Sequence, residues 1–188
     1  ISWAAPAEGS IFAAGEAVEL SLLVSDLEES PADISLSWNS DIDGSISQQS
    51  SDSNGEATIL ATTLSTGQHV LTVTAVDSQG LSSSAARSIT MNGLPSAATL
   101  TLTPNAPTTT DDVVITAQGA ADPEGETISY TYFWYLGGGL SGASSSATLP
   151  AAATTKGDTW TVHVYSNDPH NAGDFATRVF SIDNSPAV

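Results

Sequence analysis

The feature that most constrains this chain of 188 residues is an internal repeat. Asp26 lies twelve residues before Trp38, and Asp122 lies twelve residues before Trp134. Each tryptophan ends an alternating apolar run, and the two tryptophans are 96 residues apart (134 − 38). Self-similarity at a fixed spacing indicates that one structural unit occurs twice.

Later markers extend the repeat at a slightly shorter spacing. They are Asp77 with Asp168, Arg87 with Arg178, and Pro95 with Pro186, each pair 91 residues apart. The shorter spacing predicts that the second copy has a loop five residues shorter, between its tryptophan and its second aspartate. The turn-forming sequence 92–95 marks the boundary, which gives two domains, residues 1–93 and 94–188. Residues 183–188 occupy the equivalent place after the second copy, which predicts a linker to a further repeat.

Both copies are predicted to fold as β-sandwiches. Apolar and polar residues alternate, as over residues 69–76 and 160–165, and short strands are separated by Gly, Asn, Asp and Pro. We therefore predict an all-β chain of two tandem immunoglobulin-like antiparallel β-sandwiches. Trp38, Trp134 and Trp160 are expected in the cores, and Trp3 is expected to cover a domain end or to face a preceding domain. The predicted strands are 10–12, 17–25, 33–38, 57–63, 69–76 and 83–91, then 98–103, 112–118, 127–135, 145–149, 159–166 and 175–182.

The charge of the chain is strongly one-sided. It has 21 acidic residues against 3 basic ones, so its formal net charge is −18. Nucleic acid and anionic membrane surfaces are excluded as partners, because no basic stripe exists to neutralise phosphates. The acidity favours either plain solubility or the binding of divalent cations.

Other signals are weak or absent. The sequence contains no cysteine, so the fold does not use disulfides or thiolate metal sites. No apolar stretch approaches the ~20 residues that a membrane helix needs, so direct membrane insertion is not expected.

Two segments of the first copy resemble the PKD (polycystic kidney disease) domain. Residues 67–80 contain a glycine, an alternating strand, and then Asp77 and Gly80 in a turn, as in strand F of that family. Trp38 is followed by a turn rich in Asp and Gly, as in its strand C. In the second copy, residues 122–127 resemble the acidic loop of bacterial cadherin-like repeats. The resemblance implies a spacer, adhesive or carbohydrate-associated module of secreted or surface proteins, and hence an extracellular location on a bacterial surface.

The acidic loops are the candidate metal sites. In an immunoglobulin-like sandwich the B–C and F–G loops lie at the same end, so carboxylates from both loops converge there. Calcium takes six to eight oxygen ligands, which carboxylates, carbonyls and water can supply. The sequence therefore predicts Ca²⁺ sites, although acidic residues in turns are also common as solvated groups. The predicted ligands are Asp122, Glu124, Glu126 and Asp168 in the second copy, and Asp26, Glu28 and Asp77 in the first.

No catalytic function is predicted. The chain lacks a Gly-x-Ser-x-Gly elbow, a His-Glu-x-x-His helix and a phosphate-binding loop with its lysine. His163 and His170 lie near Asp168 and Asp174, but no paired spacing supports a transition-metal site, so solvated or hydrogen-bonded histidines are the simpler reading.

Two functions therefore compete. The first is an extracellular structural spacer or adhesive repeat of a longer surface protein, stalk or filament, stiffened by calcium, with neighbouring repeats as its partners. The alternative is a glycan- or protein-binding accessory module of a secreted protein, which would display exposed aromatic residues. Open strand edges also permit homo-assembly by strand addition.

Overall fold

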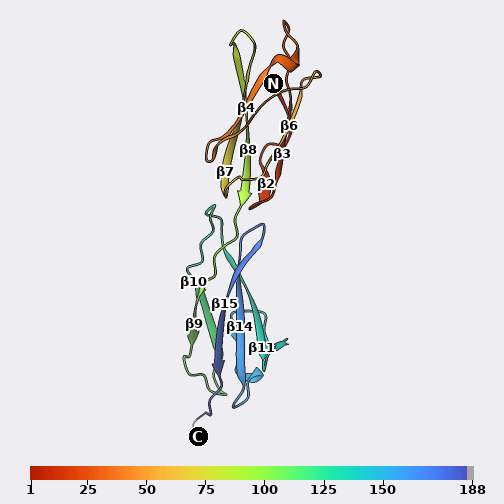
Figure 1. Ribbon diagram of the computed structural model, residues 1–188. Coiled ribbons are helices and arrows are strands. Elements are labelled where there is room, and N and C mark those ends of the chain that lie inside the picture. Colours follow the sequence, from red (N-terminus) through yellow and green to blue (C-terminus); the bar gives the residue numbers. More distant parts are fainter. Residues whose placement is uncertain (186–188) are drawn as a thin grey trace. The chain divides into compact units, whose positions relative to one another are not determined.

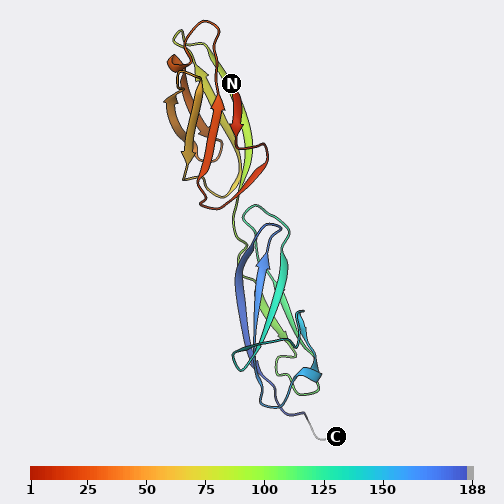
Figure 2. The same ribbon diagram turned by 90° about the vertical axis from the view of Figure 1, so that its right-hand side faces the viewer.

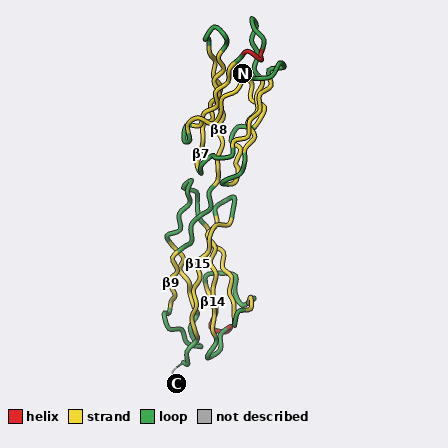
Figure 3. The backbone as a smooth tube through the Cα atoms, in the orientation of Figure 1, coloured by secondary structure: helices red, strands yellow, loops and turns green. Residues whose placement is uncertain are grey.

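The computed structural model describes residues 1–185, and its helical content is limited to two short 3-10 turns in that range, Pro31–Asp33 and Ala151–Ala153 (Figure 3). Pro186, the last marker of the repeat, and the end of the predicted second domain lie outside the described residues. The chain divides into two compact units, Ile1–Gly93 (unit 1) and Leu94–Val188 (unit 2). Neither 3-10 turn has the length and hydrophobicity needed to span a bilayer.

Unit 1 is a sandwich of a three-stranded and a five-stranded sheet, with strand orders β1-β3-β6 and β2-β8-β7-β4-β5 (Figure 1). All of its strand pairs are antiparallel except β2 with β8, which is parallel. The strands are β1 (Ser2–Ala5), β2 (Ser10–Ala13), β3 (Val18–Leu23), β4 (Ser35–Ser40), β5 (Gly44–Ser50), β6 (Glu56–Ala61), β7 (Gly67–Val76) and β8 (Ser82–Asn92).

Unit 2 has a three-stranded sheet of order β13-β10-β9 and a four-stranded sheet of order β12-β11-β14-β15. Figures 1 and 2 show β11, β14 and β15 side by side. The strands are β9 (Thr99–Thr103), β10 (Val113–Gln118), β11 (Ser129–Leu136), β12 (Gly139–Ser141), β13 (Thr148–Leu149), β14 (Thr159–Asn167) and β15 (Ala172–Ser181).

The predicted fold class is confirmed, and the alternation of the sequence explains it. Along β7, His69, Leu71, Val73 and Ala75 are buried, while the residues between them are more exposed. Such a period of two places every second side chain on the core face of a strand. Each unit has its own hydrophobic cluster in this way.

The tryptophans sit at the centres of these cores, with one correction to the prediction. Trp38, Trp134 and Trp160 are all buried, as expected. Trp3 does not cover a domain end: it lies in β1, and its ring meets the Trp38 ring edge to face at 5.5 Å. An edge-to-face pair adds stabilisation beyond the area that it buries. Trp3 therefore packs, partly buried, against the core of unit 1.

Three strands were missed by the sequence analysis: β1, β5 and β12. The strand after the tryptophan is long in unit 1 and short in unit 2. It is β5 with seven residues in unit 1 and β12 with three in unit 2. Both lack a clear apolar alternation, since edge strands pack few side chains into the core.

One turn has an absolute requirement for glycine. Gly55 has a φ of +84°, and a Cβ atom there would lie 2.0 Å from the carbonyl oxygen of Val24. The Gly55 carbonyl in turn accepts a hydrogen bond from the Val24 amide at 2.8 Å. Only glycine allows this approach, which fixes the turn before β6.

Candidate metal centre

The loop between β10 and β11 and the turn between β14 and β15 bring three carboxylates of unit 2 together. Asp122, Glu126 and Asp168, named here the acidic cluster, each offer one oxygen atom within 4.8 Å of the others. Asp168 is buried, and the other two are partly buried. Two ligands on opposite sides of one calcium ion are separated by about twice the Ca–O distance of 2.3–2.6 Å. The spacing of the acidic cluster therefore suits a single ion.

Hydrogen bonds within each loop orient these aspartates. Asp122 Oδ1 accepts hydrogen bonds from the amides of Glu124 at 2.9 Å and Glu126 at 3.0 Å. Asp168 Oδ1 accepts from the amide of His170 at 2.6 Å and also from the amide of Asn171. Such turns close on the aspartate's own backbone and fix its side chain.

Other oxygens of the acidic cluster are buried without a donor. Asp122 Oδ2 and Glu126 Oε2 are both inaccessible to solvent and accept no hydrogen bond. Buried carboxylate oxygens without partners are costly, and nearby negative charges repel one another. A divalent cation among them offsets both effects, because it supplies the missing ligand and neutralises the charge.

His170 lies at the edge of the acidic cluster. Its Nε2 atom is 3.3 Å from Glu126 Oε1, and both side chains are about one third exposed. At this exposure an ion pair contributes little to stability. His163 lies elsewhere, on β14, where its ring packs between Tyr135 and Phe175. The two histidines thus do not share a site.

Glu124 has a different place from the one predicted. It is not one of the three residues whose oxygens converge, and its backbone amide donates to Asp122. Asn167, at the end of β14, donates its side-chain amide to Thr131 Oγ1 at 3.0 Å. The structure therefore brings together three of the four predicted ligands in unit 2.

The corresponding residues of unit 1 are not brought into such a group within the described part of the chain. Asp26 Oδ1 accepts from the amide of Glu28 at 2.8 Å, and Asp77 Oδ1 accepts from the amide of Leu81 at 2.8 Å. The Glu28 side chain is exposed. The residue that connects the two loops is Glu29, whose carboxylate accepts from Ser78 N at 3.1 Å and Ser78 Oγ at 2.6 Å.

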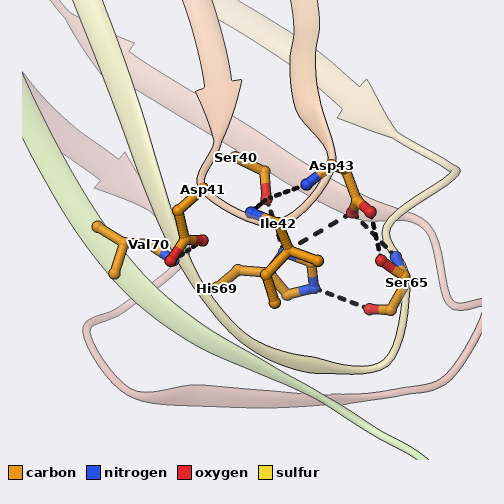
Figure 4. A network of polar contacts seen from close by, with 7 residues as sticks. All are labelled: Ser40, Asp41, Ile42, Asp43, Ser65, His69 and Val70. Atoms are coloured by element: carbon orange, nitrogen blue, oxygen red, sulfur yellow. Dashed lines mark hydrogen bonds and ion pairs between the residues drawn. The ribbon is translucent and has the colours of Figure 1, made fainter.

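A second polar network in unit 1 was missed by the sequence analysis (Figure 4). His69 is fully buried, with Nδ1 2.8 Å from Ser40 Oγ and Nε2 2.7 Å from the Ser65 carbonyl oxygen. Since a carbonyl oxygen can only accept, Nε2 is the donor in its contact with Ser65. Ser40 is itself buried, so this Ser–His pair ties strands together and is closed to a substrate.

Two aspartates complete this network. Asp43 accepts hydrogen bonds from the Ser65 hydroxyl and from the Ser65 amide, and it lies 3.7 Å from His69 Nδ1. The hydrogen bond from the Ser65 hydroxyl is the main reason that the pKa of Asp43 lies below its usual value. Asp41 Oδ1 accepts from the Val70 amide at 2.8 Å. The sequence displays the Asp-rich turn after Trp38. It gives no sign that Asp43 in this turn pairs with Ser65, in the loop before β7.

Comparisons with known proteins agree with this architecture. The sequence profile of the PKD domain matches residues 3–90, which is nearly all of unit 1. The resemblance noted in the sequence is thus confirmed there. A comparison with curated protein sequences gives no match.

Solved structures of similar fold are tandem modules. Domains A168–A170 of titin share 10% identity at a TM-score of 0.54, covering 94% of this chain and 62% of that one. The titin I-band fragment I67–I69 shares 16% identity at a TM-score of 0.51, covering 97% and 64%. The fibronectin(III)-like modules of Clostridium thermocellum CbhA share 19% identity over 97% and 94%, with a TM-score of 0.41. At these identities the titin fragments show the fold alone, and the chain spans just under two thirds of each.

Proposed function

With a PKD domain as its first unit and a second sandwich of related fold after it, we propose that this chain is a spacer or adhesive repeat of a longer extracellular protein. A bacterial surface protein, stalk or filament is the setting that the family and the charge favour. The match of the PKD domain to residues 3–90 supports this, because the resemblance implies a spacer or adhesive module of secreted or surface proteins. Neighbouring repeats are then its direct partners, and no enzymatic activity is assigned to it.

The observation that carries this proposal is that two sandwiches, each with its own core, follow one another on one chain. Trp38 lies at the centre of one hydrophobic cluster and Trp134 at the centre of the other. Because each cluster is built from residues of one unit, each unit resists unfolding by itself. A protein built in this way sets a distance or carries a load through its fold.

Calcium is the second element of the proposal. The acidic cluster of unit 2 offers carboxylate oxygens at the spacing of one ion, and two of its buried oxygens have no donor. In this proposal Ca²⁺ joins the loop before β11 to the turn before β15 and stabilises that end of unit 2. The net charge of −18 also favours a medium rich in divalent cations.

Single-molecule force spectroscopy tests the mechanical role. The full chain, held between handles at its two ends, is expected to unfold in two separate events. Each event should release roughly 300 Å of chain, because about 90 residues extend at 3.3–3.6 Å each. A single event of twice that length, or unfolding without a force peak, contradicts the role of two load-bearing repeats.

A further inference from the structure

The outer face of the four-stranded sheet of unit 2 is aromatic. Along β11 the side chains of Tyr132 and Trp134 pack toward the core, so Phe133 and Tyr135 lie on the opposite face. Their cross-strand neighbours follow from the register, which pairs Phe133 with His163 and Tyr165 with Phe175. We name Phe133, Tyr135, His163, Tyr165 and Phe175 the aromatic face.

The five rings of the aromatic face contact one another continuously across three strands. Tyr135 meets His163 at 4.7 Å between ring centroids, and Phe175 meets both His163 and Tyr165 at 4.9 Å. Phe133 meets Tyr165 nearly at a right angle, at 5.7 Å. These contacts hold the rings in place without burying them, so the surface is ordered before any partner arrives.

The aromatic face is open to solvent and slightly hollowed. Phe133 is 39% exposed, Phe175 is 41% exposed, and Leu140 on β12 is 66% exposed. A shallow hollow of about 450 Å³ is lined by Phe133, Tyr135, Leu140 and Tyr165 together with Thr131, Asn167 and Ala172. Hollows of this size with aromatic walls and few polar groups are typical of ligand sites.

The aromatic face also contains no Asp, Glu, Lys or Arg, in a chain with 21 acidic residues. Besides the five rings, the register places uncharged side chains on this side of the sheet: Ser129, Thr131, Leu140, Thr159, Thr161, Asn167, Ala172, Thr177, Val179 and Ser181. A basic partner would be attracted to the acidic surfaces elsewhere, and a second copy at −18 would be repelled. An uncharged surface therefore suits a neutral partner.

The polar groups that line the hollow beside the rings suit a partner rich in hydroxyl groups. The Asn167 amide is held by donation to Thr131 Oγ1 at 3.0 Å, and the tyrosines bring phenolic hydroxyls. Rings that contact the apolar C–H face of a sugar, beside amides and hydroxyls that bond its oxygens, form a carbohydrate surface. We propose that the aromatic face of unit 2 docks a neutral polysaccharide. This site depends neither on calcium nor on the spacer role.

Affinity electrophoresis of the full chain tests the assignment. The chain is run in native gels that contain barley β-glucan, arabinoxylan, galactomannan or dextran, with alginate as the charged comparison, and it is mixed with insoluble cellulose and chitin. We expect at least one neutral polysaccharide to retard or capture the chain, and alginate to leave it unaffected. No retention by any of the neutral polysaccharides overturns the proposal.

Two variants locate the surface. Phe133→Ala and Tyr165→Ala are each expected to weaken binding about tenfold or more, the effect of losing a central contact. Leu60→Ala removes an apolar side chain of 60% exposure from β6 of unit 1, and it should bind as the original chain does. Far-ultraviolet circular dichroism confirms that each variant is folded. Equal binding by Phe133→Ala overturns the assignment.

Sedimentation velocity separates a polysaccharide from the other occupant of such a face. The chain is expected to remain monomeric at the concentrations used for binding. A dimer that Phe133→Ala converts to a monomer would show that a second copy covers the aromatic face, and the carbohydrate assignment would then be wrong.

Discussion

Each unit has one pair of acidic loops, which carry Asp26 and Asp77 in unit 1 and Asp122 and Asp168 in unit 2. The carboxylates of the two pairs have different partners. In unit 1, the Glu29 carboxylate reaches across to the amide and hydroxyl of Ser78, so protein donors satisfy it. In unit 2, Glu126 reaches toward Asp122 and Asp168, and a buried oxygen of Glu126 accepts no hydrogen bond. In both units each of these aspartates accepts a hydrogen bond from the amide two residues further along the chain.

This difference shows that one loop pattern supports two kinds of connection. A serine at position 78 supplies two donors, and a direct hydrogen-bonded link between the loops results. In unit 2 the three carboxylates of the acidic cluster offer one another only acceptors, so a link among them requires a cation, while His170 Nε2 lies beside them, 3.3 Å from Glu126 Oε1. The two cases differ in whether the side chains that meet across the loops are a carboxylate with a serine, as in unit 1, or three carboxylates, as in unit 2.

The largest expected effect is the response of unit 2 to calcium. At a calcium concentration 100-fold above Kd, thermal unfolding of the full chain should show a gain of about 2.7 kcal/mol relative to chelator. For a unit of this size the midpoint should rise by about 10 °C or more. The double variant Asp122→Asn/Glu126→Gln should lose this gain, and in chelator it should be at least as stable as the original chain, because it removes repelling charges.

A matched control lies in unit 1. Asp26→Asn/Asp77→Asn removes the same number of charges with side chains of the same shape, and each new amide keeps an oxygen to accept the turn hydrogen bonds. This variant should keep the full response to calcium. A response that disappears in this control, or that is absent from the original chain, refutes the distinction between the two units.

A smaller effect is expected at the direct link of unit 1. Ser78→Ala removes the hydroxyl that donates to Glu29 at 2.6 Å. The loss should be about 1 kcal/mol, since the pair is exposed and the amide contact remains. It should be the same in calcium and in chelator, as measured by urea unfolding. Ser78→Thr keeps the hydroxyl and should restore most of the stability, and a loss that depends on calcium would contradict a direct link.

The smallest effect concerns pH and the turn after β4 in unit 1. The Ser65 hydroxyl and amide hold the pKa of Asp43 below its usual value, so the folded state is favoured when Asp43 is ionised. This contribution is present above the unfolded pKa of about 3.9 and is lost as pH falls further. Asp43→Asn should cost about 1 kcal/mol or less at pH 7 and progressively less below about pH 4.

Urea unfolding of both proteins between pH 7 and pH 2 measures this difference. The comparison with Asp43→Asn is needed because other carboxylates titrate in the same range. Two stability curves that stay parallel down to pH 2 would show that Asp43 has no such role.

The sandwich fold could be predicted because it depends on patterns that a sequence displays directly. The alternation over residues 69–76 became β7, and the tryptophan at the end of each alternating run became a core residue. The strands β1 and β12 could not be predicted, because a short edge strand is defined by its pairing with the neighbouring strand. Its own sequence shows no clear alternation of apolar and polar residues. Trp3 was misplaced for the same reason: its contact with Trp38 depends on the pairing of β1 with β3.

The candidate site was harder to predict, since it depends on which side chains point across a gap between loops. Topology was sufficient to expect Asp122 near Asp168. The sequence could not show that Glu29, and not Glu28, makes the contact between the loops of unit 1. It also could not separate Glu126 from Glu124 in unit 2, because neighbouring residues in a loop point in different directions. The aromatic face was equally hidden, because its rings come from β11, β14 and β15 and form one surface only in the correct register.

The first residues of unit 2 are fixed to the start of β15 and to the loop before β11, which carries Asp122. The Pro95 carbonyl accepts a hydrogen bond from the Asp174 amide at 3.0 Å, and Ser96 exchanges hydrogen bonds with Ala121, the neighbour of Asp122. A Cβ atom on Gly173 would lie 2.3 Å from the Pro95 oxygen, so no larger residue fits there. A version of unit 2 that is fused to another protein must therefore include residues 94–96, because they belong to the folded domain and are not a flexible linker.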